Sequence, residues 1–104
     1  MRAVRIHEAA SREAIEAAEW YEHKRPGLGA EFEQAIDAAL DFLEEDIVPL
    51  LPVPFSARAR GVKRLILKRF PFDVVVVERR TEVFIIAFAH HARRPGYWRL
   101  RRRR

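Results

Sequence analysis

The stretch VVVVERRTEVFIIAFAH, residues 74–90, decides the fold class of this chain. Its β-branched and aromatic residues predict one strand over residues 74–78, a tight connection at residues 79–81 and a second strand over residues 82–90. A sheet that is covered on one side alternates apolar with polar side chains, whereas both of these strands are apolar on both faces. Each face of the predicted sheet therefore needs a cover.

Further strands are expected on the N-terminal side of this stretch. Residues 62–70 form a strand candidate that a turn at residues 70–73 separates from the next strand, so three consecutive strands predict an antiparallel meander. Residues 2–7 alternate in polarity as a short strand does. The proline-rich residues 49–61 predict an extended surface connection that is neither helix nor strand.

Two helices are expected between the first strand and this connection. The first runs from about Ala9 to Lys24, with Ser11 as its N-cap and with Trp20 and Tyr21 as core and edge packing. Proline and glycine at residues 25–29 end it. The second helix has the strongest helical periodicity in the chain, carried by Phe32, Ala35, Ile36, Ala39, Leu40 and Leu43.

The expected fold class is therefore α+β, with an antiparallel helical hairpin packed on a small, mainly antiparallel sheet in the order β-α-α-β-β-β. The hairpin covers one face of the sheet. The other face needs the chain's own C-terminal segment, a second copy of the chain or a different protein.

Length and composition agree with one compact domain over residues 1–104. Chains divide mainly beyond about 250 residues, and 49% apolar residues with seven Phe, two Tyr and two Trp supply a small core. The net charge of +5 conceals two opposed halves, because residues 1–57 carry 5 basic and 12 acidic side chains and residues 58–104 carry 15 basic and 3 acidic. Only the second half has an electrostatic reason to meet phosphate or an acidic partner.

Several classes of protein are excluded by what the sequence lacks. It contains no cysteine, which excludes disulfides, thiolate catalysis and thiolate metal sites. No apolar run approaches the roughly 18 residues of a membrane span, and the charged N-terminal region has no signal-peptide core. We therefore expect a cytoplasmic protein without a membrane association, a metal or a cofactor.

The order of elements and several short motifs resemble the RelE/ParE superfamily, the toxins of bacterial type II toxin–antitoxin modules. The resemblance covers nearly the whole chain. The matching pieces are residues 17–22 (AAEWYE), residues 26–29 (PGLG) followed by Phe32, Lys63 with Arg64, residues 69–72 (RFPF) and residues 89–98 (AHHARRPGYW).

This resemblance implies one of two activities. Members similar to RelE cleave mRNA in the ribosomal A site, whereas members similar to ParE poison DNA gyrase without known nuclease chemistry. Either activity implies growth inhibition, a role in plasmid stabilization and neutralisation by a cognate antitoxin in a hetero-oligomer. An acidic and apolar antitoxin segment that orders as it binds would suit the two-faced sheet and the basic half. We accordingly expect the chain to aggregate or to be toxic when it is expressed alone.

The residues available for RNA cleavage lie in the basic half. Attack by the 2′-OH needs a general base, a general acid and cations around the phosphate, but no metal. Under this interpretation the candidates are His90, His91, Arg64, Arg93 and Tyr97. Adjacent strand residues point to opposite faces, so at most one of the two histidines faces any site. The other interpretation is that one histidine caps the sheet edge and the other is solvated.

The remaining cations and one aromatic residue are candidates for binding a partner or nucleic acid. They are Lys63, Lys68, Arg69, Arg94, Trp98 and Arg99, followed by a basic tail over residues 99–104 that we expect to be mobile. We favour the gyrase-directed branch, because the helical hairpin fits it and residues 90–98 contain no carboxylate to assist a nuclease. The mRNA endonuclease is the first alternative, and a non-toxic module that binds nucleic acid is the second.

Overall fold

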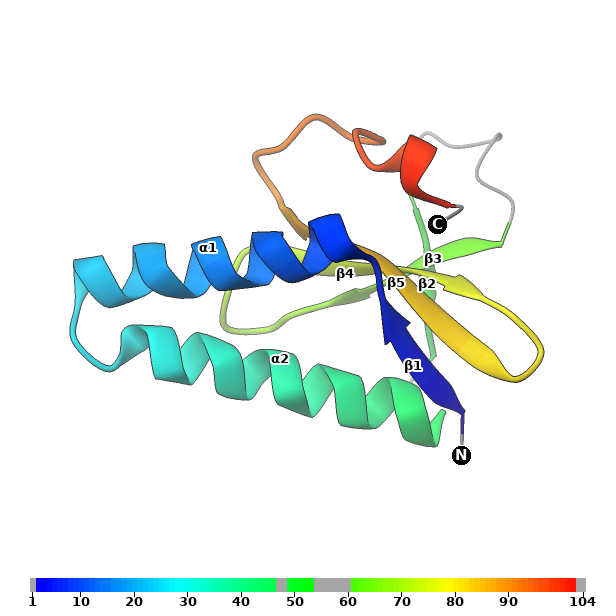
Figure 1. Cartoon of the computed structure of the whole chain (residues 1–104), viewed down its shortest axis with the longest axis horizontal. Coiled ribbons are helices and arrows are strands. Elements are labelled where there is room, and N and C mark those ends of the chain that lie inside the picture. The colour runs from blue at the N-terminus through cyan, green and yellow to red at the C-terminus, as the bar shows by residue number, and fades with distance from the viewer. Residues whose placement is uncertain (1, 47–48, 54–60, 103–104) are drawn as a thin grey trace.

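The computed structural model describes residues 2–46, 49–53 and 61–102, and these residues form an α+β domain with a helical hairpin beside a five-stranded sheet (Figure 1). The elements, in chain order, are β1 (Ala3–Ile6), α1 (Glu8–Lys24), α2 (Leu28–Glu45), β2 (Leu51–Pro52), β3 (Val62–Ile66), β4 (Phe72–Glu78), β5 (Glu82–His90) and the 3-10 helix η1 (Arg99–Arg101). The sheet order is β1-β5-β4-β3-β2, with β1 parallel to β5 and every other pair antiparallel. The predicted fold class and the antiparallel meander are confirmed.

The first helix begins earlier than predicted and has a different cap. Its N-cap is His7, whose Nδ1 accepts a hydrogen bond from the backbone N–H of Ala9 at 3.0 Å. Ser11 lies inside the helix, so its prediction as the N-cap was wrong. A histidine ring nitrogen here accepts the hydrogen bond that a serine hydroxyl usually accepts at a helix start. Histidine is not among the preferred N-cap residues, so residue preferences did not predict this cap.

The hairpin connection is also shorter than predicted, because α2 already begins at Leu28. Gly27 adopts φ 91°, a left-handed conformation that glycine reaches without steric cost. The Glu22 carboxylate of α1 then accepts hydrogen bonds from the backbone N–H groups of Gly27 and Gly29 at 2.9 and 3.0 Å. A side chain of the first helix therefore caps the second, which fixes the two helices side by side.

Two boundaries in the sheet differ from the sequence prediction. Leu51 and Pro52 form β2 on the edge of β3, where a proline is tolerated because its missing N–H faces solvent; the prediction that this segment is not a strand was wrong. Residues 54–60 of the same predicted connection lie outside the described residues. Strand β3 ends at Ile66, and β4 begins at Phe72, so Asp73 belongs to a strand and not to a turn.

The helix-side core lies between the hairpin and one face of the sheet. Tyr21 contacts the rings of Phe32, Phe70 and Phe72 with centroid distances of 5.2, 5.0 and 6.4 Å. Trp20 is 57% exposed, so its assignment to the core was wrong, because a residue at this position of α1 faces solvent. The buried members of this core are Ala10, Phe32, Ile36, Ala39, Leu43, Leu67, Phe70, Phe72, Val74, Val76, Val83, Ile85 and Phe88.

The opposite face of the sheet is covered by the chain's own C-terminal segment, the first of the three covers considered. Trp98 is only 6% exposed there, and Tyr97 packs beside it. A register shift between Val75 and Val76 leaves Ile86 without an opposite residue on β4, so Ile86 and Ala87 both face this second core. Its buried members are Val62, Val75, Val77, Phe84, Ile86, Ala87, Ala89 and Trp98.

The predicted basic tail has a defined beginning. Arg99–Arg101 forms η1, and the Arg101 guanidinium forms an ion pair with Glu13 of α1 at 2.9 Å. Residues 103–104 lie outside the described residues. The mobility of the tail stays a prediction. None of the described helices is long and apolar enough to span a membrane.

Candidate functional site

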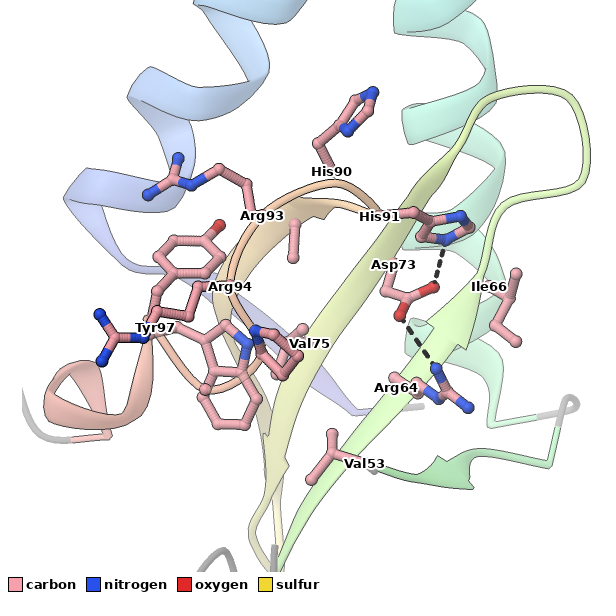
Figure 2. Close-up of a pocket in the computed structure, with 14 residues that line it drawn as sticks. Val53, Arg64, Ile66, Asp73, Val75, His90, His91, Arg93, Arg94 and Tyr97 are labelled. Carbon is pink, nitrogen blue, oxygen red and sulfur yellow. Dashed lines mark hydrogen bonds and ion pairs between the residues drawn. The ribbon is translucent and has the colours of Figure 1, made fainter. Parts of the chain in front are cut away.

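The cavity that contains the nuclease candidates, which we call the principal cavity for that reason, lies on the second face of the sheet, between strands β3 to β5 and residues 91–98 (Figure 2). Its volume is about 270 Å³. All five candidates for nuclease chemistry line it, together with Arg94 and Trp98. The complete lining is Val53, Arg64, Ile66, Asp73, Val75, Ala89, His90, His91, Arg93, Arg94, Pro95, Gly96, Tyr97 and Trp98.

Asp73 organises one side of this cavity. Its Oδ1 lies 2.8 Å from His91 Nε2, and its Oδ2 accepts a hydrogen bond from Arg64 Nη1 at 3.2 Å. The Asp73 side chain is 14% exposed, whereas the His91 side chain is 45% exposed. A carboxylate that accepts a hydrogen bond from Nε2 favours the tautomer with the proton on that nitrogen, which leaves Nδ1 as the acceptor of the imidazole. His91 can therefore exchange a proton with a bound group, while Arg64 supplies a fixed positive charge.

Asp73 was not predicted as a site residue, because the sequence pattern placed it in a turn and because it lies outside residues 90–98, where a carboxylate partner was expected. The strand register shows why Asp73 lies beside the predicted residues. Asp73 pairs with Ala89 of β5, and Arg64 pairs with Val75, two residues further along β4. Positions two residues apart on a strand share a face, so the hairpin register brings Arg64, Asp73 and the end of β5 together.

Tyr97 lies on the other side of the cavity, and its hydroxyl is already bound. The hydroxyl donates a hydrogen bond to Glu13 Oε2 at 2.6 Å, and the Arg93 guanidinium carbon lies 3.9 Å from the ring centroid. Burial and the adjacent Glu13 carboxylate raise the pKa of Tyr97 far above its ordinary value. A phenol in this state is a poor proton donor, so Tyr97 contributes a wall to the cavity.

His90 points away from His91, as alternation along a strand requires (Figure 2). Its Nδ1 accepts a hydrogen bond from the backbone N–H of Ala92 at 2.9 Å. Its ring meets Phe72 nearly at right angles, with centroids 5.0 Å apart. This is the backbone-capping role that the sequence allowed for one of the two histidines.

The nuclease candidates therefore fall into separate groups around one cavity. His91 and Arg64 share Asp73, whereas Arg93 and Tyr97 stack on the opposite wall and His90 turns outward (Figure 2). The structure brings the imidazole of His91 and the guanidinium group of Arg64 together on one carboxylate. Among the described residues, neither of the other two candidates for proton transfer, His90 and Tyr97, is directed toward the same point.

Four of the predicted binding residues lie outside this cavity. Lys63 forms an ion pair with Glu78 at 2.8 Å, and Arg99 is exposed on η1. Lys68 and Arg69 line a second cavity of about 450 Å³, which we call the α2–β3 groove. The other residues of the groove are Ala35, Ala38, Ala39, Phe42, Leu65, Ile66 and Leu67.

The α2–β3 groove is apolar and partly exposed. Phe42 and Ile66 are 43% and 40% exposed, which is unusual for large apolar side chains. Strand β2 pairs with Lys63 and Arg64 only, so among the described residues the outer edge of β3 at Leu65 and Ile66 has no strand beside it, while the inner edge pairs with β4. Arg69 is held by an ion pair with Glu31 of α2, and Lys68 is exposed.

Within residues 2–46, 49–53 and 61–102, no group of three or more histidine or acidic side chains is placed to hold a metal ion. The histidine and carboxylate of the principal cavity form a pair with an arginine, which repels a cation.

Comparisons with known proteins identify the fold. No protein-family model matches this chain, and no curated protein matches it in sequence. Its structure is similar to a chain of the solved structure described as the chromosomal ParDE toxin–antitoxin system from P. aeruginosa. The TM-score is 0.72 at 18% sequence identity, and the similarity covers 86% of this chain and 96% of that chain. The domain therefore has the fold of a chain of this ParDE system, which agrees with the fold that the resemblance of its motifs implies.

Proposed function

We propose that this chain is the toxin of a type II toxin–antitoxin module. The observation that carries the proposal is the fold, which is similar over 86% of the chain to a component of a ParDE system. The motif resemblance supports it independently, because it rests on short pieces distributed from residue 17 to residue 98. Fold alone does not determine function, so the molecular target is argued from the site.

The proposed target is DNA gyrase. Cleavage of RNA requires a general acid and a general base that converge on one phosphate. In the principal cavity the hydroxyl of Tyr97 is bound to Glu13 and His90 turns outward, so His91 is left without a second proton-transfer group. This arrangement supports a toxin that acts by binding.

A ribosome-dependent mRNA endonuclease is the second candidate, and the Asp73 cluster favours it. His91 and Arg64 are held by one carboxylate at the edge of an open cavity, which is a suitable start for proton transfer beside a phosphate. Arg93 and Arg94 line the same cavity and would add positive charge. If a bound ribosome or mRNA supplies the missing acid, this cluster becomes the catalytic site.

The proposed antitoxin binds the α2–β3 groove. An acidic and apolar segment would place apolar side chains on Phe42 and Ile66 and carboxylates beside Lys68. Such a segment orders as it binds, and the complex is a toxin–antitoxin hetero-oligomer. A short acidic reading frame beside the gene would be its source.

The decisive experiment expresses the chain in a bacterium and compares plasmid supercoiling with mRNA cleavage at ribosomes. Under the gyrase proposal, supercoiling changes and the variants His90→Ala, His91→Ala and Tyr97→Ala remain largely toxic. Loss of toxicity in His91→Ala with preserved folding, together with ribosomal mRNA cleavage, selects the endonuclease. Phe32→Asp, which places a charge in the fully buried core, is the unfolded control.

One result would overturn both candidates. Soluble, harmless expression without a partner contradicts the toxin proposal. If such a protein also binds nucleic acid with an affinity that falls steeply with salt and survives mutation of His90 and Tyr97, the non-toxic binding module is correct.

A further inference from the structure

Glu13 connects the helical hairpin to the C-terminal residues. Its Oε2 accepts a hydrogen bond from the Tyr97 hydroxyl at 2.6 Å, and its Oε1 forms an ion pair with Arg101 at 2.9 Å. Oε1 also accepts a hydrogen bond from the backbone N–H of Phe88 at 3.1 Å. The Glu13 side chain is only 14% exposed, so these three donors compensate for its removal from water.

These contacts replace a strand that the sheet lacks. Strand β1 ends at Ile6 opposite Ile85, so among the described residues no strand borders this edge of β5 beyond Ile85. Glu13 satisfies the N–H of Phe88 there, and Arg101 donates to the carbonyl of Ile86 at 3.2 Å. The side chains of Glu13 from α1 and Arg101 from η1 thus form the hydrogen bonds with this edge of β5 that a neighbouring strand would otherwise form.

The residues that Glu13 holds are also the cover of the second core. We define the C-terminal strap as residues 97–102, of which Trp98 is buried against Val75, Val77, Phe84 and Ile86 of the sheet. Tyr97 and Trp98 also form part of the wall of the principal cavity. One carboxylate on α1 therefore controls both the cavity wall and the cover of an apolar sheet face.

We propose that Glu13 is a positioning residue that latches this strap, and that the strap opens as a unit when the Glu13 contacts are lost, while the hairpin and the sheet stay folded. The reason is the location of the core. The helix-side core holds the hairpin to the sheet without any residue of the strap, whereas the strap inserts a single buried side chain, Trp98, on the opposite face. A segment with one buried anchor and a few polar contacts has a low local free energy of opening. The device does not depend on the toxin assignment.

Tryptophan fluorescence tests this proposal directly, because the chain has two tryptophans and Trp20 is exposed on α1. In a Trp20→Phe background, Trp98 is the single reporter of strap position. Glu13→Gln and Glu13→Ala should raise acrylamide quenching of Trp98 about threefold or more, with the helical circular dichroism unchanged. Glu16→Gln, at an exposed position on the same helix, is the matched control and should leave quenching unchanged.

Two further variants keep the test decisive if Glu13 variants fail to fold. Arg101→Met and Tyr97→Phe remove the strap side of the same contacts and leave α1 intact. In a double-mutant cycle, Glu13→Gln should add little to the quenching of the variant that already carries both strap substitutions. The effects would be additive if Glu13 only stabilised α1.

Hydrogen exchange supplies the result that would overturn the proposal. For the amides of residues 97–101, the free energy of opening should be nearly independent of urea concentration, as in a local opening. For the amides of β4 and β5, it should fall with urea as the free energy of global unfolding does. The proposal fails if the strap amides exchange only with global unfolding in every variant, or if Trp98 stays shielded when Glu13 and Arg101 are both replaced.

Discussion

At Tyr97, one hydrogen bond decides whether a phenol can take part in chemistry. The residue lines the principal cavity, but its hydroxyl donates to Glu13, and the Arg93 and Arg101 guanidinium carbons lie 3.9 and 5.1 Å from its ring centroid. His91 differs, because its carboxylate partner Asp73 leaves the second ring nitrogen available. The two residues differ because the carboxylate binds the one polar atom of the Tyr97 side chain but only one of the two ring nitrogens of His91.

The raised pKa of Tyr97 has a consequence for stability at alkaline pH. An unfolded tyrosine ionises near pH 10, whereas folded Tyr97 stays protonated to higher pH because of burial and Glu13. The folded state then binds more protons than the unfolded state, so this contribution to the free energy of unfolding is present below about pH 10 and is lost as the pH rises above it. Tyr97→Phe should reduce this alkaline loss, by up to about 1.4 kcal/mol per pH unit.

Urea unfolding at several pH values between about 8 and 11 measures this effect. Tyr21, whose pKa is also raised by burial, contributes equally to both proteins and cancels in the comparison. An equal alkaline loss in wild type and Tyr97→Phe would show that Tyr97 ionises normally in the folded protein.

At the scale of elements, the close contact of α1 with α2 depends on Gly29. A Cβ at this position would lie 2.6 Å from the backbone oxygen of Ala18 and 3.0 Å from Glu22 Oε1. Gly29→Ala therefore forces the helices apart and disturbs the carboxylate that caps α2, with an expected loss of about 1–3 kcal/mol of unfolding free energy. The free energy comes from urea unfolding followed by circular dichroism.

Gly27 is the matched comparison because its cost has a different origin. A Cβ there meets no atom within 4 Å, but φ is 91°, so Gly27→Ala costs only backbone strain of about 1–2 kcal/mol. Gly27→Asn should recover part of this loss because asparagine tolerates left-handed φ, whereas Gly29→Asn should not. Recovery at both positions would contradict the steric explanation for Gly29.

Glu78 of β4 forms ion pairs with β3 and with the residue that precedes β1. Its carboxylate lies 2.8 Å from Lys63 Nζ on β3 and 2.7 Å from Arg2 Nη1 just before β1. Hydrogen bonds from Lys63 and then Arg2 lower the pKa of Glu78. Its contribution to stability is therefore present above the ordinary glutamate pKa of about 4.3 and is lost as the pH falls through the lower folded pKa.

Glu78→Gln should lower the unfolding free energy at pH 7 by about 1–2 kcal/mol and weaken its acid dependence. Thermal unfolding between about pH 3 and pH 7 provides the measurement. Glu45→Gln, at an exposed position near the end of α2, is the control and should reproduce the wild-type profile. A profile unchanged by Glu78→Gln would mean that this ion-pair group is fully screened by solvent.

The elements that sequence predicted well are those that local periodicity specifies. Strand β5 has the predicted bounds, α1 begins one residue before its predicted start, and α2 contains all the residues of the predicted periodicity. Two of the failures are non-local, because the edge pairing of β2 and the exposure of Trp20 depend on neighbours distant in sequence. The cap from His7 is local, since its partner is Ala9, but it uses a side chain that cap preferences do not favour. The site depends on distant neighbours in the same way as the pairing of β2 does. The residue types of the basic half predicted the residues that line the cavity, but only the strand register shows that Asp73 contacts both His91 and Arg64.

At the scale of the whole molecule, the two charged halves of the chain are joined by ion pairs. Glu13 with Arg101 and Glu31 with Arg69 each link the acidic hairpin to the basic half. These arginines are therefore partly neutralised by the fold. Lys68 has no such carboxylate within the part of the chain that the structure describes, so it is the exposed cation best placed to attract an acidic partner to the α2–β3 groove.

Charge reversal in the groove tests this proposed division between the antitoxin surface and the toxic site. Lys68→Glu should weaken binding of the protein encoded by the neighbouring acidic reading frame about tenfold, because a carboxylate then opposes the acidic segment. Toxicity should remain, since Lys68 lies outside the principal cavity. Titration calorimetry of the purified pair and growth during co-expression measure the two effects. Arg80→Glu changes the same charge at an exposed position beyond β4. An equal loss of binding in Arg80→Glu would show that the antitoxin responds to net charge and not to the groove.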